Sequence, residues 1–201
     1  MFKDFVLHIN RNDLSISKLI EKYGDVDLKE SKHKFKSLVN IIVSQQLSTS
    51  SAQKIFNKLA SRLNNNFDPN LVLNLNDQDF KEIGLSKQKI KYIKGLSSEI
   101  IKKELVLDDL KSKPDKLIHQ RLLKLNGFGN WSADIFLLFG LGRENVLVSS
   151  DYGIRKAIQS LYKLKQLPSP EQVFKIAKEH QWEPYCSYVC LYLWKSLENS
   201  S

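Results

Sequence analysis

Residues 125–134 read Leu-Asn-Gly-Phe-Gly-Asn-Trp-Ser-Ala-Asp, with two glycines between apolar segments. The pattern predicts that one helix ends at Leu125, that the glycines turn the chain, and that a second helix begins near Asn130 or Trp131. Glycine permits positive φ and leaves no side chain between the backbone and a ligand. N–H groups at the start of the second helix can then hold an anion such as a phosphate. A plain turn with Gly127 as the helix stop is the structural alternative.

The rest of the chain is also typical of helices, and the sequence predicts an all-α fold. Only 8 glycines and 5 prolines occur in 201 residues, and the polar–apolar alternation that marks strands is scarce. Residues 64–69 indicate a turn-rich connection, and residues 199–201 are expected to fray. Helices are predicted at 16–23, 34–44, 48–63, 77–83, 87–103, 115–125, 132–139, 152–162, 171–180 and 184–197.

The chain carries an excess of positive charge, with 31 Lys and Arg against 22 Asp and Glu and a formal net charge of +9. This excess suits a polyanionic partner, because each neutralised phosphate releases counterions. A lysine-rich solvated surface would give the same count. No apolar run approaches the roughly 20 residues of a membrane span, and residues 1–10 do not resemble a signal peptide. We therefore expect a cytoplasmic protein with no membrane partner, associated with the nucleoid if the source is prokaryotic.

A second informative segment, residues 146–156, reads Val-Leu-Val-Ser-Ser-Asp-Tyr-Gly-Ile-Arg-Lys. An apolar run leads into a polar corner, and a helix is predicted to begin at about Tyr152. Asp is common as the cap of a helix N-terminus, so Asp151 has a purely structural reading. The same place also suits a reactive carboxylate, because a helix N-terminus stabilises negative charge.

Together these segments resemble the helix-hairpin-helix DNA glycosylase superfamily, and within it the 3-methyladenine DNA glycosylase II type, in a minimal form without an N-terminal β domain. Residues 125–134 resemble the hairpin, within a motif at about 115–139, and Asp151 resembles the catalytic Asp. The resemblance implies one two-lobed all-α unit, with the DNA-binding and active-site cleft between the lobes. The expected lobes are 34–127, and 1–33 combined with 128–201.

The resemblance also implies how the hairpin binds DNA. A phosphate of the DNA backbone is expected at Gly127, Phe128, Gly129 and Ser132. In similar proteins the hairpin often holds a monovalent cation, Na⁺ or K⁺, through main-chain carbonyls, which would be those of Leu123, Leu125 and Phe128. No side-chain metal ligand and no required cofactor are implied. The expected partner is double-stranded DNA containing a damaged base, bound by a monomer.

One carboxylate suffices for the implied chemistry. Breaking an N-glycosidic bond passes through an oxocarbenium-like sugar, and a nearby carboxylate stabilises its positive charge. The carboxylate can also orient or deprotonate the attacking water. A purine alkylated at N3 or N7 already carries positive charge, so it leaves without a strong general acid. Asp151 is therefore the expected catalytic residue.

Two absences narrow the expected activity. Similar enzymes that also cut the DNA backbone carry a Lys immediately after the Gly-x-Gly-x run, where this chain has Trp131. Without an amine for a Schiff base, we expect a monofunctional glycosylase with no lyase activity. The superfamily's iron–sulfur branch uses four cysteines, whereas this chain has two, Cys186 and Cys190. We expect no cluster and interpret both cysteines as small buried side chains on one helix face.

A base must leave the stack before a pocket can act on it, and a side chain must fill the gap. Residues 44–48, Ser-Gln-Gln-Leu-Ser, resemble the superfamily's turn between two helices. By position Gln46 is the first candidate for this wedge and Leu47 the second. A polar corner in which Ser48 or Thr49 caps the next helix is the structural alternative.

Three aromatic residues align with positions that line the base pocket in similar enzymes. Trp131, Tyr152 and Trp194 could attract a cationic alkylated base by cation–π interaction, a term that neutral bases lose. Each could equally belong to the core. Residues 182–187 resemble the superfamily's Trp-x-Pro-Tyr-Arg-Ser, except that Cys186 replaces the arginine, which puts that arginine's contact in doubt.

The expected function is therefore removal of alkylated purines, such as 3-methyladenine and 7-methylguanine, in DNA base excision repair. One alternative is a glycosylase for mismatched or oxidised bases. The other, from a different class, is a non-catalytic protein that binds damaged or abasic DNA. Pocket width and polarity decide the preferred base, and the sequence does not specify them.

Overall fold

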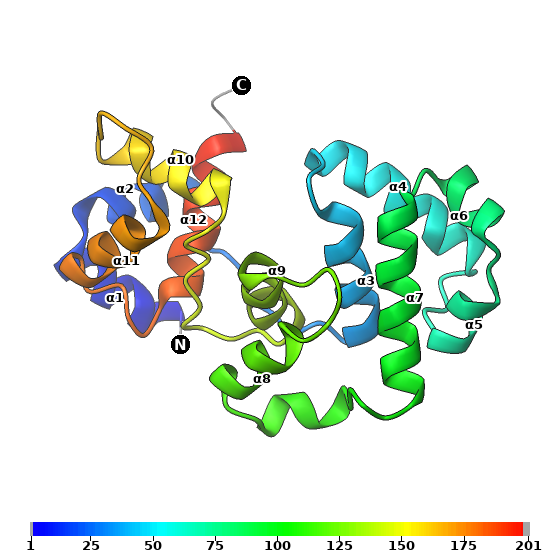
Figure 1. Cartoon of the computed structure of the whole chain (residues 1–201). Helices are drawn as coiled ribbons and strands as arrows, with labels where there is room; N and C mark the ends of the chain where they lie inside the picture. The colour runs from blue at the N-terminus through cyan, green and yellow to red at the C-terminus, as the bar shows by residue number, and fades with distance from the viewer. Residues whose placement is uncertain (1, 199–201) are drawn as a thin grey trace. The chain divides into compact units, whose positions relative to one another are not determined.

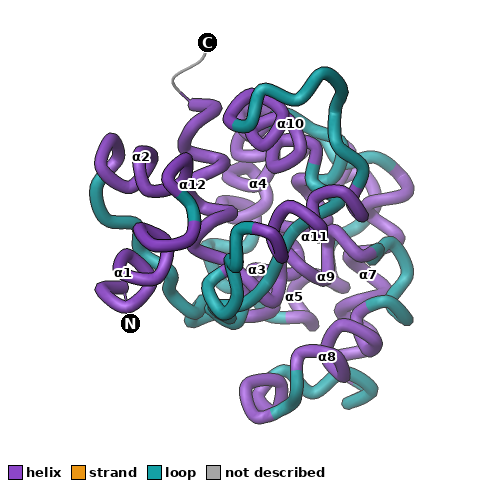
Figure 2. Tube along the Cα trace, turned by 90° about the vertical axis from the view of Figure 1, so that its left-hand side faces the viewer, coloured by secondary structure: helices purple, strands orange, loops and turns teal. Residues whose placement is uncertain are grey.

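The computed structural model describes residues 2–198 and divides into two compact units. One combines residues up to Glu30 with those from Gly142 onward, and the other is Ser31–Leu141. Figures 1 and 2 show helices and loops, and no strand occurs in residues 2–198. The all-α prediction is confirmed, whereas the expected fraying of 199–201 lies outside the described residues. None of the described helices has the length and apolarity that crossing a bilayer requires.

The first unit is built from both ends of the chain. It contains α1 (Phe2–Asn12), α2 (Leu14–Tyr23), α10 (Tyr152–Leu161), α11 (Pro170–Glu179) and α12 (Cys186–Glu198). Helices α2 and α10 pack on α12, which is the most deeply buried helix of the unit. Cys186 and Cys190 are buried in this core and are not joined in a disulfide, which confirms their interpretation as buried side chains.

A buried carboxylate ties this unit together. Asp13 is 2% exposed, and its Oδ1 caps α2 by accepting the N–H groups of Ser15 (3.0 Å) and Ile16 (3.1 Å). Its Oδ2 accepts a hydrogen bond from the indole of the fully buried Trp182 at 2.7 Å and another from the Tyr162 hydroxyl. Burial, followed by the charge of Asp13, raises the pKa of Tyr162, so this hydroxyl remains a donor. Tyr162 is the residue that caps the C-terminal end of α10, and Asp151 caps its N-terminal end. The network around Asp13 therefore anchors the helix that carries Asp151.

The second unit is a continuous stretch of chain organised around α3. It contains α3 (Lys34–Ser44), α4 (Thr49–Arg62), α5 (Pro69–Asn74), α6 (Asp77–Ile83), α7 (Lys87–Ile101), the 3₁₀ turn η1 (Asp108–Ser112), α8 (Asp115–Leu122), α9 (Asn130–Ile135) and the π-helical turn η2 (Phe136–Gly140). Helix α3 packs against α4, α7, α9 and η2, and α7 runs beside it in Figure 1. Its apolar residues are buried on several sides, which explains its high hydrophobic content.

Most predicted helices occur within a few residues of their expected bounds, and 34–44 and 77–83 match their observed bounds. The predicted helix 132–139 begins earlier, at Asn130, and continues as η2, whereas 115–125 ends at Leu122. Three elements were missed: α1, α5 and η1. Helix α5 lies partly in the predicted turn, where Asp68 caps it and Pro69 occupies its first turn. This pair is a helix-start signal that the turn-rich composition masked.

The boundary between the units differs from the predicted lobes. The first lies between Glu30 and Ser31, near the expected one. The second lies after Leu141 rather than after Gly127. The reason is packing, because α9 and η2, which follow the hairpin, pack on α3 and α8 and so belong with the helices that precede it.

Candidate functional site

Asp151 lies at the start of α10, in the first unit, with its side chain partly exposed. Its backbone is extended (φ −68°, ψ 128°), and its Oδ1 accepts the N–H of Ile154 at 2.9 Å. The interpretation of Asp151 as the N-terminal cap of a helix is therefore confirmed. The same Oδ1 also accepts the indole N–H of Trp194 at 3.0 Å. Two donors therefore fix the orientation of a carboxylate that sits at the positive end of a helix.

The other two residues of this unit's candidate site are Tyr152 and Trp194. Tyr152 is 67% exposed, so it is not a core residue. Trp194 is half-buried on α12, and its indole N–H is directed at Asp151. The structure thus brings Trp194 and Asp151 together and shows a positioning contact that the pocket prediction had not included.

Gly153 makes this close approach possible. A Cβ at this position would lie 3.0 Å from Oδ1 of Asp151 and 3.3 Å from Cδ1 of Trp194. Any larger residue would therefore push on the carboxylate or the indole. Sequence reasoning missed Gly153, although glycine inside a first helical turn is unfavourable and indicates a close contact.

The hairpin belongs to the second unit and depends on Gly127. Its φ is +87°, which disfavours other residues, and a Cβ here would lie 2.2 Å from Cδ2 of Tyr92 on α7. The turn is closed by the N–H of Phe128, which donates to the carbonyl of Leu125 at 3.1 Å. Gly129 differs, because a Cβ there would have no protein atom within 4 Å. Gly127 is thus required by the protein itself, whereas Gly129 leaves open space beside the turn.

The remaining hairpin residues divide into buried and accessible ones. The side chains of Phe128 and Ser132 are 7% and 2% exposed, so they face the core. A phosphate contact by these residues therefore has to use main-chain groups, and the N–H of Ser132 lies in the first turn of α9, whose N–H groups lack helical acceptors. Trp131 is half-buried at the same helix start.

The predicted wedge lies at the corner between α3 and α4. Gln46 is exposed and has φ 56°, a left-handed conformation that is unfavourable for a residue with a side chain. Leu47 is 39% exposed. Ser48 caps α4 by accepting the N–H of Ser51 at 3.3 Å, so the alternative interpretation of this corner as a helix cap is correct for Ser48. The cap does not use the side chain of Gln46, so it is compatible with the wedge prediction.

Gln45, the residue before the wedge, was missed as a functional candidate. Its side-chain Nε2 donates to the carbonyl of Gly127 at 2.7 Å and to Oγ of Ser132 at 3.0 Å. The corner and the hairpin are therefore directly hydrogen-bonded. The repeated Gln in the Ser-Gln-Gln run was the only local hint, because nothing in the sequence pairs residue 45 with residue 127.

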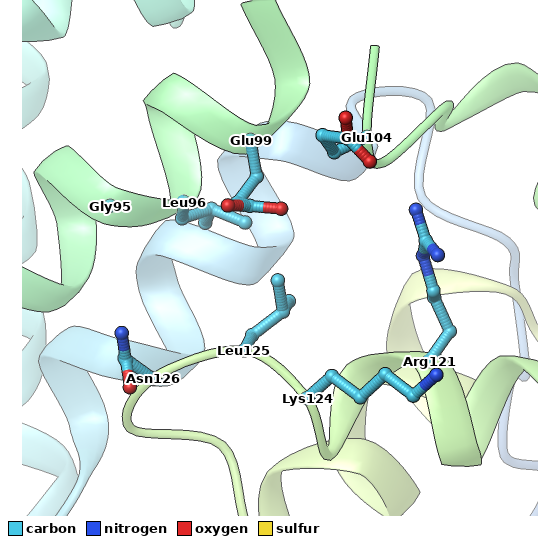
Figure 3. A pocket seen from close by; sticks show the side chains of 8 residues that line it. All are labelled: Gly95, Leu96, Glu99, Glu104, Arg121, Lys124, Leu125 and Asn126. Carbon is cyan, nitrogen blue, oxygen red and sulfur yellow. The ribbon is translucent and has the colours of Figure 1, made fainter. Parts of the chain in front are cut away.

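A small hollow of about 160 Å³ lies beside the hairpin, between the C-terminal half of α7 and the end of α8 (Figure 3). It is lined by Gly95, Leu96, Glu99, Glu104, Arg121, Lys124, Leu125 and Asn126. Acidic and basic side chains occur together, so its charge does not select for an anion. It contains none of the side chains predicted to contact DNA or the damaged base.

Oδ1 of Asp134 on α9 lies 3.2 Å from Nε2 of His119 on α8, across the two helices of the hairpin motif. Burial raises the pKa of Asp134 to about 6, and the nearby imidazole offsets part of this effect. The folded protein therefore holds this proton more tightly than the unfolded chain, with its usual pKa of 3.8. The stabilisation is present in acid and is lost as pH rises through about 6.

We expect Asp134→Asn to become more stable relative to wild type as pH rises. Between pH 4 and pH 7.5 the difference in the free energy of unfolding should move by about 1–3 kcal/mol in favour of the variant. Urea unfolding of both proteins at the two pH values measures this. A variant that loses stability relative to wild type over the same interval would show that the contact with His119 outweighs the burial of the charged carboxylate.

The comparisons with known proteins agree with these features. The family model described as the HhH-GPD superfamily of base excision DNA repair proteins matches residues 39–182. The chain belongs to this superfamily. The match includes the corner, the hairpin and Asp151, and the predicted membership is confirmed.

Individual superfamily relatives extend the likeness to almost the whole chain. The protein is 27% identical over 192 residues to DNA-3-methyladenine glycosylase 1 of Schizosaccharomyces pombe, covering 94% of this chain and 83% of that one. It is also 30% identical over 191 residues to the Bacillus subtilis protein YfjP. That alignment covers 92% of this chain and 66% of YfjP.

Two solved structures show the same fold. The DNA-3-methyladenine glycosidase of Bacillus halodurans matches with a TM-score of 0.81 and 29% identity, over 98% of this chain and 90% of that one. The 3-methyladenine DNA glycosylase of S. pombe, solved in complex with abasic DNA, matches with a TM-score of 0.90 and 24% identity, over 97% of each chain. The predicted helix-hairpin-helix glycosylase fold is therefore confirmed.

Proposed function

We propose that this protein is a monofunctional DNA glycosylase that hydrolyses the N-glycosidic bond of alkylated purines in base excision repair. The class agrees with the relatives named as 3-methyladenine DNA glycosylases, of which DNA-3-methyladenine glycosylase 1 covers 94% of this chain. One observation carries the proposal: in a member of this superfamily, Asp151 is held at a helix N-terminus by the indole N–H of Trp194. That arrangement supplies a fixed negative charge.

The carboxylate acts on the sugar. The bond between C1′ and the purine nitrogen breaks, and its electron pair stays with the base. Because an alkylated purine is cationic, it leaves as a neutral molecule, and the positive charge moves to the sugar. Asp151 stabilises this oxocarbenium-like sugar by its charge. Water then adds to C1′ and loses a proton, which Asp151 can accept. The products are free base and an abasic site.

Selectivity and DNA binding would come from the other candidate residues. The exposed ring of Tyr152 can attract a cationic base, as can the half-buried rings of Trp131 and Trp194. Open space at Gly129 and main-chain N–H groups at the start of α9 suit a backbone phosphate. The net charge of +9 supports binding to double-stranded DNA. One chain carries all these groups, so a monomer suffices. The proposed location is the cytoplasm, with association with the nucleoid if the source is prokaryotic.

A monovalent cation at the hairpin, Na⁺ or K⁺, forms part of this proposal. The carbonyls of Leu123, Leu125 and Phe128 would hold it. Neutral main-chain oxygens are suitable ligands for such ions, and although the Leu125 carbonyl accepts the Phe128 N–H, its oxygen has a second lone pair. The cation would help the hairpin to attract a phosphate. No required cofactor and no iron–sulfur cluster are part of the proposal.

A panel of lesion-containing duplexes tests the function. It contains 3-methyladenine, 7-methylguanine, 1-methyladenine, ethenoadenine and hypoxanthine, together with a mismatch and an oxidised base. We expect release of at least one alkylated purine, with strand cleavage only after alkali treatment. Cleavage without alkali would contradict the absence of lyase activity. Release only from the mismatch or the oxidised base would overturn the substrate class, and tight abasic-site binding without any release would indicate a binding protein.

A further inference from the structure

The corner that carries Gln46 is held from two sides by side chains of its own unit. On one side, Gln45 Nε2 donates to the Gly127 carbonyl (2.7 Å) and to the Ser132 hydroxyl (3.0 Å). Its two N–H groups are thus directed at the two ends of the hairpin turn, one before and one after Gly129. Gln45 therefore connects the corner both to the hairpin turn and to α9, the helix that follows the turn.

On the other side, Lys89 of α7 holds the main chain of the corner. Its Nζ donates to the carbonyls of Val43 and Gln45, each at 2.8 Å. These are carbonyls at the C-terminal end of α3, which have no helical donor and carry partial negative charge. Burial partly desolvates the ammonium of Lys89, which lowers its pKa. The interactions of this ammonium are therefore less screened than they would be on an open surface.

Gln46 itself needs such support. Its φ of 56° is unfavourable for a side-chain-bearing residue, and the conformation persists only where neighbouring contacts impose it. The N–H of Leu47 donates to the carbonyl of Ser44 at 3.3 Å, which closes the turn around Gln46. The hydrogen bonds of Gln45 and Lys89 flank this turn, so they set the direction in which Gln46 projects.

We infer that Gln45 and Lys89 are positioning residues that fix the Gln46 wedge at a set spacing from the phosphate-binding hairpin. The inference rests on the proposed function, because it assigns a role in opening duplex DNA. A hairpin that grips a phosphate and a wedge that enters the stack must match the fixed spacing of the DNA. A displacement of about 1 Å at such a contact can lower a rate by about 100-fold.

The test compares single-turnover base release at saturating enzyme from two duplexes. One has the alkylated purine of the lesion panel that wild type releases fastest, opposite its normal pairing partner, and the other has the same lesion opposite an abasic-site analogue. Opening costs less in the second duplex, because the lesion has no pairing partner, so wedge placement matters less there. The variants are Gln45→Glu, which keeps the shape but loses both N–H donors, and Lys89→Met. Lys89→Arg is the conservative rescue, and Lys91→Met removes an exposed ammonium from the same helix as a charge control.

We expect Gln45→Glu and Lys89→Met to lower the rate by about 10- to 100-fold on the paired duplex and by less than about threefold on the other. Lys89→Arg and Lys91→Met should stay within about threefold of wild type on both. Fluorescence of 2-aminopurine placed beside an abasic-site analogue reports unstacking of the DNA. It should show less unstacking with Gln45→Glu and Lys89→Met than with wild type.

Equal losses on both duplexes would indicate general unfolding and would overturn the inference, as would unchanged rates on both. Failure of the proposed function looks different, because wild type itself would then release no base from any duplex in the lesion panel.

Discussion

Asp151→Asn should lower the single-turnover rate of base release by at least about 1,000-fold, because it removes the negative charge that stabilises the oxocarbenium-like sugar and the group that accepts a proton from water. The substitution isolates charge from structure. Asn is as good a helix cap as Asp, and its side-chain oxygen can still accept the N–H groups of Ile154 and Trp194. The measurement is release of the base that wild type removes fastest.

Two controls accompany the Asp151 variant. Its midpoint of thermal unfolding and its affinity for an abasic-site analogue should remain close to wild type. Asp151→Ala should instead lose the cap as well and be less stable by about 1 kcal/mol. Release by Asp151→Asn within about tenfold of wild type would show that another group performs the chemistry.

Gly127→Ala should lower the free energy of unfolding by about 2–5 kcal/mol and weaken binding to abasic-site DNA by at least about tenfold. Two costs add up. The left-handed backbone, with φ +87°, costs a side-chain-bearing residue about 1–2 kcal/mol. The new Cβ would also overlap the ring of Tyr92, whose Cδ2, Cε2 and Cγ lie within 2.5 Å of it, and such overpacking costs about 1–3 kcal/mol. Urea unfolding and fluorescence anisotropy measure the two effects.

The second glycine of the hairpin is the matched control. Gly129 has φ −114° and no protein atom near its Cβ position, so Gly129→Ala should change stability by less than about 1 kcal/mol. In a Tyr92→Ala background, Gly127→Ala should cost less than in wild type, because the ring is gone and only the backbone term remains. Equal costs in both backgrounds would show that the contact with Tyr92 contributes nothing.

Local sequence signals predicted most of the helices. Asp151 at the start of α10 is a signal that acts over a few residues of chain, and it caps that helix in the structure. The differences from the prediction have two causes, one local and one tertiary. Helix α5 was obscured by turn-forming residues around Asp68, and the boundary after Gly127 was misplaced because sequence does not show on which helices α9 packs.

The candidate residues were likewise found by motif, whereas their partners were not. Asp151, Gly127 and Gln46 stand in recognisable strings, so the sequence by itself determined the superfamily, the all-α fold and the residues to examine. Only the tertiary structure showed that Trp194 orients Asp151 across 43 residues of chain, and that Gln45 reaches Gly127 across 82. Hydrogen bonds and ring contacts depend on distances in space, and residues so far apart in sequence meet only once the helices between them have packed.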